Sequence, residues 1–392
     1  MNEDIQNFIP YGRQSLNEDD ITSVIEVLKS PFLTQGPVGG AFESEIASIT
    51  GSTYCVSLNS ATSALHIACL ALGLGKGDWL WTSPITFVAS ANCGLYCGAK
   101  VDFVDINLST GLIDIEKLSQ KLEEAKLLGR LPKIIIPVHL AGSSCDMAEI
   151  KKLSDKYGFF IIEDASHALG GEYKSLPVGS CSFSSVCVFS CHPVKIITTG
   201  EGGLATTNDP KIYESIMELR SHGITKNKER FLNDNKESWR YEQQKLGYNY
   251  RLSDIQSALG LSQLKRLKDI ITQRTNLFLR YQKLLDGLPV ELLKVPKSVK
   301  SSFHLGVVRI LNSDPKRHEM IFDYLRSHRI GVQVHYIPVH TQPYYMKFGF
   351  KEGDFPNAEK YSKTSFSLPL FPGLSTQDQD YVIKMLIKAL SL

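Results

Sequence analysis

The sequence lacks a charge excess of either sign and lacks long apolar runs. Its 43 Lys and Arg residues are balanced by 41 Asp and Glu residues, so the net charge over 392 residues is +2. Proteins that bind nucleic acids or anionic membranes through a basic surface carry a much larger positive excess. No apolar run approaches the ~20 residues that a transmembrane helix needs. We therefore expect neither a nucleic-acid partner nor a membrane partner.

Cysteine spacings typical of a metal site are also absent. The eight cysteines form no C-x-x-C pair, and none is spaced from a histidine as in a zinc site. Most lie in apolar segments, so we expect buried free thiols in a reducing compartment. The first ten residues contain acidic side chains and no apolar core of a signal peptide. The expected location is the cytoplasm.

Two common nucleotide-binding motifs are missing as well. The glycine-rich segment Gly73-Leu74-Gly75-Lys76-Gly77 does not have the G-x-G-x-x-G spacing, and it is better explained as a turn that ends a helix. No P-loop motif occurs in the chain. The sequence therefore disfavours a nicotinamide-dependent Rossmann enzyme.

Short apolar runs alternate with amphipathic segments up to about residue 220. The runs with strand character are residues 54–58, 79–83, 101–104, 134–138, 159–162 and 186–189. The segments with helical periodicity between them are residues 60–72, 90–97, 115–127 and 147–157. Continuous apolar strands separated by helices predict an α/β fold with a parallel sheet covered on both faces.

The pattern changes after residue 220. Residues 225–240 are polar and predict a long loop, which in a compact domain is usually functional. The remaining elements that we predict are one or two helices at 252–285, strands at 307–311 and 331–335, and helices at 317–328 and 376–390. We therefore predict a large domain at residues 1–250 and a smaller α+β domain at residues 251–392.

The first of three chemistry-bearing segments, Asn59-Ser60-Ala61-Thr62, joins a predicted strand to a helix. Ligands of open α/β sheets bind at the carboxyl ends of strands. Free N–H groups and the helix dipole at a helix start attract phosphate, and the hydroxyls of Ser60 and Thr62 add donors. The same residues also fit an ordinary Ser N-cap. The segment alone leaves both interpretations open.

The other two segments carry a carboxylate and an amine. The apolar run at residues 159–162 leads to Asp164, and a buried carboxylate needs a cation or a strong donor unless it caps a helix. Lys195 follows the run at residues 186–189 and precedes a glycine-rich turn. A buried lysine loses its proton more easily and becomes a nucleophile, whereas a lysine that reaches solvent does not.

Together the three segments meet the requirements of pyridoxal 5′-phosphate (PLP). The helix start accepts the phosphate, the carboxylate pairs with the pyridine nitrogen, and the lysine forms a Schiff base. We therefore predict a PLP enzyme in which Lys195 and Asp164 are the catalytic residues.

The sequence resembles the sugar aminotransferases of the DegT/DnrJ/EryC1/StrS family from about residue 8 to residue 390. The most specific match runs from Ser190 through His192, Pro193 and Lys195 to Gly203. Residues 33–36, 59–64, 163–168 and 247–252 also match. The resemblance implies fold type I of the PLP-dependent transferases. In that fold, a large domain has a mostly parallel seven-stranded sheet between helices, and a smaller α+β domain follows.

The resemblance also implies roles for individual residues. It assigns Lys195 to the Schiff base and Asp164 to the pyridine nitrogen. Phe87 falls where an aromatic ring stacks on the cofactor, and His167 lies beside the cofactor's ring oxygen, at a position that is Gln in many members. Asn249 matches a residue that the partner subunit contributes to the phosphate site, which implies a homodimer with shared sites. The phosphate contacts that it implies are Ser60, Ala61, Thr62 and Ser190.

Within the family, the segments around Lys195 and at residues 334–339 are most similar to the aminotransferases of pseudaminic-acid biosynthesis. That similarity implies L-glutamate as the amino donor. It also implies a UDP-linked 4-keto-6-deoxy-N-acetylhexosamine of L-altro type as the acceptor. His335 and His340 have no nearby carboxylate or cysteine to complete a metal site, so we predict no metal. The substrate contacts that we expect are Thr34, His192, His335, Tyr336 and His340.

Three other functions fit the same fold. The related PLP-dependent sugar dehydratase has histidine in place of the Schiff-base lysine, so Lys195 favours transamination. A binding protein without turnover would not need the intact set of Asp164, Lys195 and phosphate site. Relatives that aminate UDP-linked D-gluco 4-keto sugars or GDP-linked perosamine precursors use the same cofactor residues, so the sequence leaves the sugar and the nucleotide open.

Overall fold

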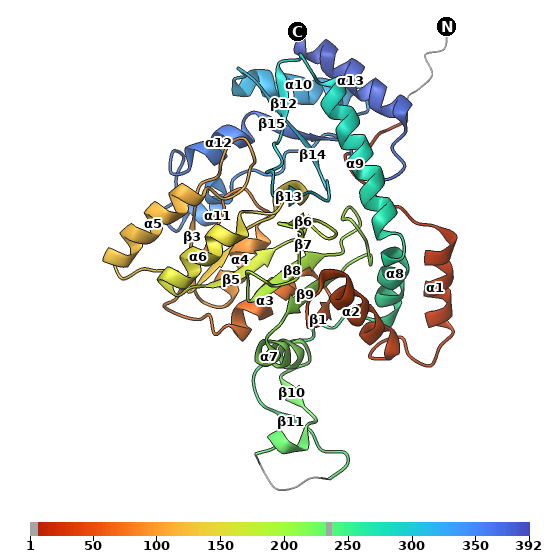
Figure 1. Cartoon of the computed structure of the whole chain (residues 1–392), viewed down its shortest axis with the longest axis vertical. Helices are drawn as coiled ribbons and strands as arrows, with labels where there is room; N and C mark the ends of the chain where they lie inside the picture. The colour runs from red at the N-terminus through yellow and green to blue at the C-terminus, as the bar shows by residue number, and fades with distance from the viewer. Residues whose placement is uncertain (1–6, 233–236) are drawn as a thin grey trace.

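The computed structural model describes residues 7–232 and 237–392 (Figure 1). Its central sheet has seven strands, in the spatial order β1 (Tyr54–Leu58), β9 (Gly203–Thr207), β8 (Val186–Ser190), β5 (Phe160–Asp164), β4 (Ile134–Ile136), β2 (Trp79–Thr82) and β3 (Lys100–Phe103). Only β9 runs antiparallel to its neighbours in this sheet. The prediction of an α/β fold with a mostly parallel seven-stranded sheet is confirmed.

Helices bury the sheet on both faces. Successive residues of a strand point to opposite sides, and at β8 this alternation separates two apolar clusters. Val186 and Val188 belong to the cluster that includes α3 (Ala61–Ala71), which packs against α4 (Ala89–Tyr96) and α7 (Pro210–Arg220). Cys187 and Phe189 belong to the cluster that includes α2 (Pro37–Thr50) and α8 (Asp254–Leu264).

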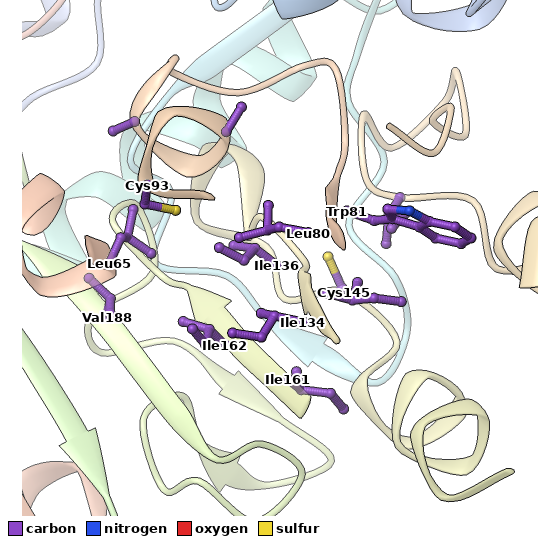
Figure 2. Close-up of a cluster of buried hydrophobic side chains, with 14 of the residues drawn as sticks. Leu65, Leu80, Trp81, Cys93, Ile134, Ile136, Cys145, Ile161, Ile162 and Val188 are labelled. Atoms are coloured by element: carbon purple, nitrogen blue, oxygen red, sulfur yellow. The ribbon is translucent and has the colours of Figure 1, made fainter. Parts of the chain in front are cut away.

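Figure 2 shows part of the first cluster. Leu65 of α3 and Cys93 of α4 lie beside strand residues such as Leu80 and Val188, and all four side chains are fully buried. Burying a side chain of this size stabilises the fold by about 1.5–3 kcal/mol. This packing fixes the starts of α3 and α4 relative to the strand ends.

The C-terminal part has its own sheet and core. The antiparallel strands β12 (Val290–Leu292), β14 (Gly306–Ile310) and β15 (Ser365–Leu368) form this sheet. Its apolar cluster draws on three helices, α9 (Leu267–Leu284), α10 (Pro315–Ser327) and α13 (Thr376–Leu390). Ile9 belongs to the same cluster and pairs with Ile330, so the N-terminal segment packs here too. The boundary at residue 250 stays a prediction.

The structure corrects one prediction of secondary structure and adds detail to another. Residues 331–335 do not form a strand, because only Gln333 bridges to Ser367 at the edge of the small sheet. The loop predicted at residues 225–240 belongs to a projecting arm (Figure 1), in which β10 (Ile224–Thr225) pairs with β11 (Glu242–Gln243). Residues 233–236 of the predicted loop lie outside the described residues.

The remaining elements are short or peripheral. The helix α1 (Glu18–Leu28) packs on α8, and α6 (Met147–Tyr157) joins α5 (Ile115–Leu127) near β5. No helix in the described part of the chain has the length and apolar character of a membrane span. The others are β6 (Glu172–Tyr173), β7 (Leu176–Pro177), β13 (Val299–Lys300), α11 (Pro343–Met346), α12 (Pro356–Ser362), and the short 3₁₀ helices η1 (Leu140–Gly142), η2 (Lys228–Arg230) and η3 (Val339–Thr341).

Candidate active site

The carboxyl ends of the parallel strands open onto one cavity of about 650 Å³. Strands β1, β5 and β8 each end beside it, as expected for ligand sites of open α/β sheets. Residues from the C-terminal part close its other side, among them Gln333. The predicted site residues that line the cavity are Ser60, Ala61, Thr62, Phe87, Asp164, His167, Ser190, His192, Lys195, His335 and Tyr336.

Three of the predicted residues lie elsewhere. Thr34 is exposed in the segment between α1 and α2, and Asn249 is exposed next to the arm. His340 does not reach the cavity, because it is fully buried and its Nε2 lies 3.0 Å from Glu359. Its ring packs edge-on against Phe355. The expectation of a substrate contact at His340 is therefore wrong.

The start of α3 has the geometry of an anion-binding site. Ser60 is the N-cap, and its Oγ accepts a hydrogen bond of 3.1 Å from the N–H of Ser63. The N–H groups of Ala61 and Thr62 have no partner within the helix, because no helical carbonyl precedes them by one turn. The positive end of the helix dipole therefore lies at the cavity. The sequence left capping and phosphate binding open, and the geometry accommodates both.

A glycine explains how β9 approaches this helix start so closely. A Cβ atom on Gly203 would lie 2.4 Å from the backbone nitrogen of Ala61, which no side chain can occupy. Gly203 ends the glycine-rich turn that follows Lys195 in sequence. The turn therefore brings the anion site and the lysine to the same end of the sheet.

Asp164 ends β5 with its carboxylate buried. Its Oδ2 accepts a hydrogen bond of 2.5 Å from Ser90 Oγ, and its Oδ1 accepts one of 3.1 Å from the N–H of Ser166. A buried carboxylate is stable only with such donors or with a cation. Asp164 lines the cavity, so a cationic ligand group can also reach it.

Lys195 lies at the cavity wall beyond β8 and is half-buried. Burial disfavours the ammonium form and lowers the pKa of Lys195 to about 8, although the negative charge of Asp164 opposes this effect. At neutral and mildly alkaline pH, a useful fraction of the side chain is therefore a free amine, the form that attacks a carbonyl carbon.

His167 is held as a neutral hydrogen-bond donor. The N–H of Ala141 donates to His167 Nδ1 over 3.3 Å, so the ring proton resides on Nε2, which lies 3.1 Å from the hydroxyl of Tyr336. Burial and the nearby charge of Lys195 lower the pKa of His167 well below its usual value.

Two further histidines surround this ring. The pKa of His335 is lowered to about 3 by burial and by Lys195, and its Nδ1 lies 2.8 Å from Ser367 Oγ. The ring of His304 lies 4.4 Å from that of His167, and burial lowers its pKa as well. The cavity wall is therefore uncharged on this side, and the carboxylate and amine side chains that line the cavity are Asp164, Lys195 and Glu201.

Ser90, Thr86 and His304 are site components that the sequence did not reveal. Ser90 lies on α4 and is hydrogen-bonded to Asp164, which is 74 positions away in the sequence. Thr86 is hydrogen-bonded to Ser90. His304 lies in an irregular segment without periodicity. Residue spacing carries no signal for such contacts because the fold alone brings these segments together.

The arrangement fits PLP. A helix start that binds phosphate, a buried carboxylate for the pyridine nitrogen and a lysine whose pKa is lowered by burial are the protein groups that this cofactor requires. Among the described residues, no group of three or more His, Cys, Asp or Glu side chains could hold a metal ion. The fold and the cavity define the class of PLP-dependent transferases.

Comparisons with known proteins narrow this class. The model of the DegT/DnrJ/EryC1/StrS aminotransferase family matches residues 14–387. The chain is 39% identical over 382 residues to the spore coat polysaccharide biosynthesis protein SpsC of Bacillus subtilis, with 96% of each chain covered. It is 38% identical over 377 residues to the UDP-4-amino-4,6-dideoxy-N-acetyl-beta-L-altrosamine transaminase of Campylobacter jejuni, with 95% of each covered.

Solved structures give the same result. Helicobacter pylori PseC, an aminotransferase involved in the biosynthesis of pseudoaminic acid, superposes with a TM-score of 0.90 at 32% identity, and the match covers 98% of this chain and all of PseC. The PLP form of a putative sugar aminotransferase from Streptococcus pneumoniae, Spr1654, gives 0.89 at 30% identity, with 98% and 99% covered. The chain belongs to the DegT/DnrJ/EryC1/StrS aminotransferase family. It is a PLP-dependent sugar aminotransferase.

Proposed function

We propose that the protein transfers the amino group of L-glutamate to C4 of a UDP-linked 4-keto-6-deoxy-N-acetylhexosamine of L-altro type. The observation that carries the proposal is the junction of Lys195, Asp164 and the start of α3 in one cavity. The similarity to the altrosamine transaminase of C. jejuni and to PseC supports this sugar. The names of the homologues support a nucleotide-linked substrate. We propose that the reaction takes place in the reducing cytoplasm.

PLP, when bound, supplies an electron sink for the bonds at the α-carbon of the amino donor. Lys195 is the base in this proposal: its free amine would take the proton from that carbon and pass it to the cofactor in the first half of the transfer, and would carry a proton from the cofactor to C4 of the sugar in the second half. A pKa of about 8 keeps the amine able to do both near neutral pH. The carboxylate of Asp164 would pair with the positively charged ring nitrogen and keep it protonated.

The walls of the cavity orient the reactants. His167 would donate its single Nε2 proton to the ring oxygen of the cofactor in place of the hydroxyl of Tyr336, which lies 3.1 Å from that nitrogen. Phe87 exposes 60% of its surface at the cavity, as a ring that stacks on a planar ligand does before the ligand is bound. Ser190 completes the phosphate contacts, and His192, exposed at the rim, contacts the sugar nucleotide.

The proposal includes a homodimer with shared active sites. Asn249 is exposed where the arm rejoins the body, in a bridge with Ser221. It is not among the residues that line the cavity of its own subunit, which is consistent with a contribution to the phosphate site of a partner. Thr34 is likewise exposed, so its proposed substrate contact also depends on that assembly.

The first experiment is visible spectroscopy of the purified PLP-loaded protein with L-glutamate. We expect the yellow band to change to the spectrum of the pyridoxamine form, and the reverse change when the L-altro UDP-keto sugar is added. A parallel panel of UDP-D-gluco and GDP-linked keto sugars tests the other substrates. A higher kcat/KM for one of these sugars overturns the L-altro assignment, and dehydration without amino transfer overturns transamination.

A further inference from the structure

Two buried hydroxyl groups extend from the cavity wall to the far side of Asp164. Thr86 lines the cavity, and its Oγ1 lies 2.7 Å from the Oγ of Ser90 on α4. The Oγ of Ser90 lies 2.5 Å from Asp164 Oδ2. Both residues are almost fully buried, with exposures of 2% for Thr86 and 0% for Ser90. The three side chains form a continuous chain whose two ends, Thr86 and Asp164, line the cavity and whose middle member, Ser90, is fully buried.

The proton on each hydroxyl can be assigned from chemistry. An ionised carboxylate only accepts hydrogen bonds, so Ser90 donates its single hydroxyl proton to Asp164. Ser90 Oγ must then accept the proton of Thr86. The only other acceptor for Ser90 in the described part of the chain is the carbonyl of Phe87, at 3.5 Å, which is too long to compete. The chain therefore runs in one direction, from Thr86 through Ser90 to Asp164.

This chain restrains the carboxylate. Ser90 fixes Oδ2, and the N–H of Ser166 fixes Oδ1, so the carboxylate cannot rotate without breaking a charge-assisted bond. In a site of low dielectric constant, successive hydrogen bonds also polarise one another. The hydroxyl of Thr86 therefore strengthens the bond that Ser90 makes.

We propose that Ser90 and Thr86 are positioning residues that hold the carboxylate of Asp164 in one orientation for the ring nitrogen of PLP. The inference rests on the proposed role of Asp164 and is independent of the sugar substrate. Ser90 contributes directly, and Thr86 contributes only through Ser90. Neither hydroxyl exchanges a proton with a reactant.

The test is the dissociation constant of PLP, measured by visible titration of the apoprotein. We expect Ser90→Ala to weaken binding about tenfold, because it removes a hydrogen bond to a charged group. Thr86→Val is nearly isosteric and should weaken it about threefold, whereas Thr86→Ser keeps the hydroxyl and should stay within about twofold of wild type. Visible circular dichroism of bound PLP should change in Ser90→Ala and Thr86→Val, because the ring orientation changes.

The decisive comparison uses Asp164→Asn as a background. If Ser90 acts through the carboxylate, Ser90→Ala adds less than about a twofold change to Asp164→Asn. Equal effects of Ser90→Ala in both backgrounds overturn the inference, as does wild-type PLP affinity in the single variant. Wild-type affinity in Asp164→Asn itself would instead refute the proposed role of Asp164.

Matched controls separate positioning from folding. Ser83 is a buried serine of the same loop, and its hydroxyl bonds to the carbonyl of Ile85. We expect Ser83→Ala to change the melting temperature of the apoprotein but not the PLP dissociation constant. If Ser90→Ala does not fold, the pair Thr86→Val and Thr86→Ser carries the test, and equal PLP affinities in these two variants overturn the proposal.

Discussion

Two carboxylates that are neighbours on β5 have opposite surroundings. Asp164 faces the cavity, where its bonding partners are a serine hydroxyl and a backbone N–H. Glu163 points to the other face of the strand. Its Oε2 lies 2.7 Å from His139 Nε2, and its Oε1 accepts a hydrogen bond of 2.5 Å from Ser184. Both carboxylates are only 5% exposed, so burial does not distinguish them.

The partners do distinguish them. The N–H of Cys145 donates to His139 Nδ1, so the proton of this histidine lies on Nε2 and points at Glu163. Glu163 thus ties the segment around residue 139 to the segment around residue 184, and the protein itself satisfies its charge. Asp164 keeps access to a ligand. A buried carboxylate therefore indicates catalysis only where its partners leave room for a further positive charge.

Among substitutions in the cavity that Asp164 faces, Lys195→Ala should have the largest effect on turnover. We expect turnover to fall by about 10⁴-fold or more, because the variant loses both the nucleophile and the base. Borohydride reduction followed by peptide mass spectrometry should find PLP attached to the Lys195 peptide in wild type and no attachment in the variant. Lys268→Ala, which removes an exposed lysine of α9, is the control. Transamination retained in Lys195→Ala would contradict the assignment.

Asp164→Asn should have the next largest effect. The amide cannot balance the positive ring nitrogen, so we expect kcat to fall by about 10²–10³-fold. The free energy of unfolding of the apoprotein should change little, because the amide oxygen can still accept the bond from the Ser166 N–H and the amide NH2 can donate to the hydroxyl oxygen of Ser90. Steady-state kinetics and denaturant titration check the two parts. A stability loss as large as the activity loss would make Asp164 a structural residue like Glu163.

The pH dependence of cofactor uptake tests the environment that Lys195 shares with Asp164. The free amine is the reactive form, and burial lowers its pKa to about 8. The rate at which the apoprotein takes up PLP should therefore rise about tenfold between pH 7 and pH 9 and then level off. Stopped-flow absorbance measures this rate. A rate that keeps rising to pH 10 would show a lysine with the pKa of a solvated side chain.

The sequence alone predicted the placement of those cavity residues that lie at or shortly after the end of a strand. Asp164 and Lys195 follow apolar runs, so the fold type alone places them at one edge of the sheet. Ser60 follows β1 in the same way. The strand β9 was not predicted, because its sequence begins with Gly203 and lacks a β-branched apolar run.

Positions outside regular elements could not be predicted in this way. His335 lies in an irregular segment and His340, five residues later, in the short 3₁₀ helix η3; only the fold determines that one lines the cavity while the other bonds to Glu359. The same holds for the partners of the two carboxylates of β5. Ser90, His139 and Ser184 come from separate segments, and no spacing in the sequence links them to β5.

Glu163→Gln should have the smallest effect on activity, and it gives the sharpest test of the difference between the two carboxylates. The substituted amide would leave the bonds from His139 and Ser184 without a charged acceptor, so we expect a loss of about 2 kcal/mol in the free energy of unfolding. Turnover of the folded enzyme should stay within about threefold of wild type, because Glu163 is not among the residues that line the cavity. Denaturant titration and kcat measure the two effects. If Glu163→Gln lowers kcat as far as Asp164→Asn does while stability is unchanged, then Glu163 takes part in the chemistry, and bonding partners alone do not separate a structural carboxylate from a catalytic one.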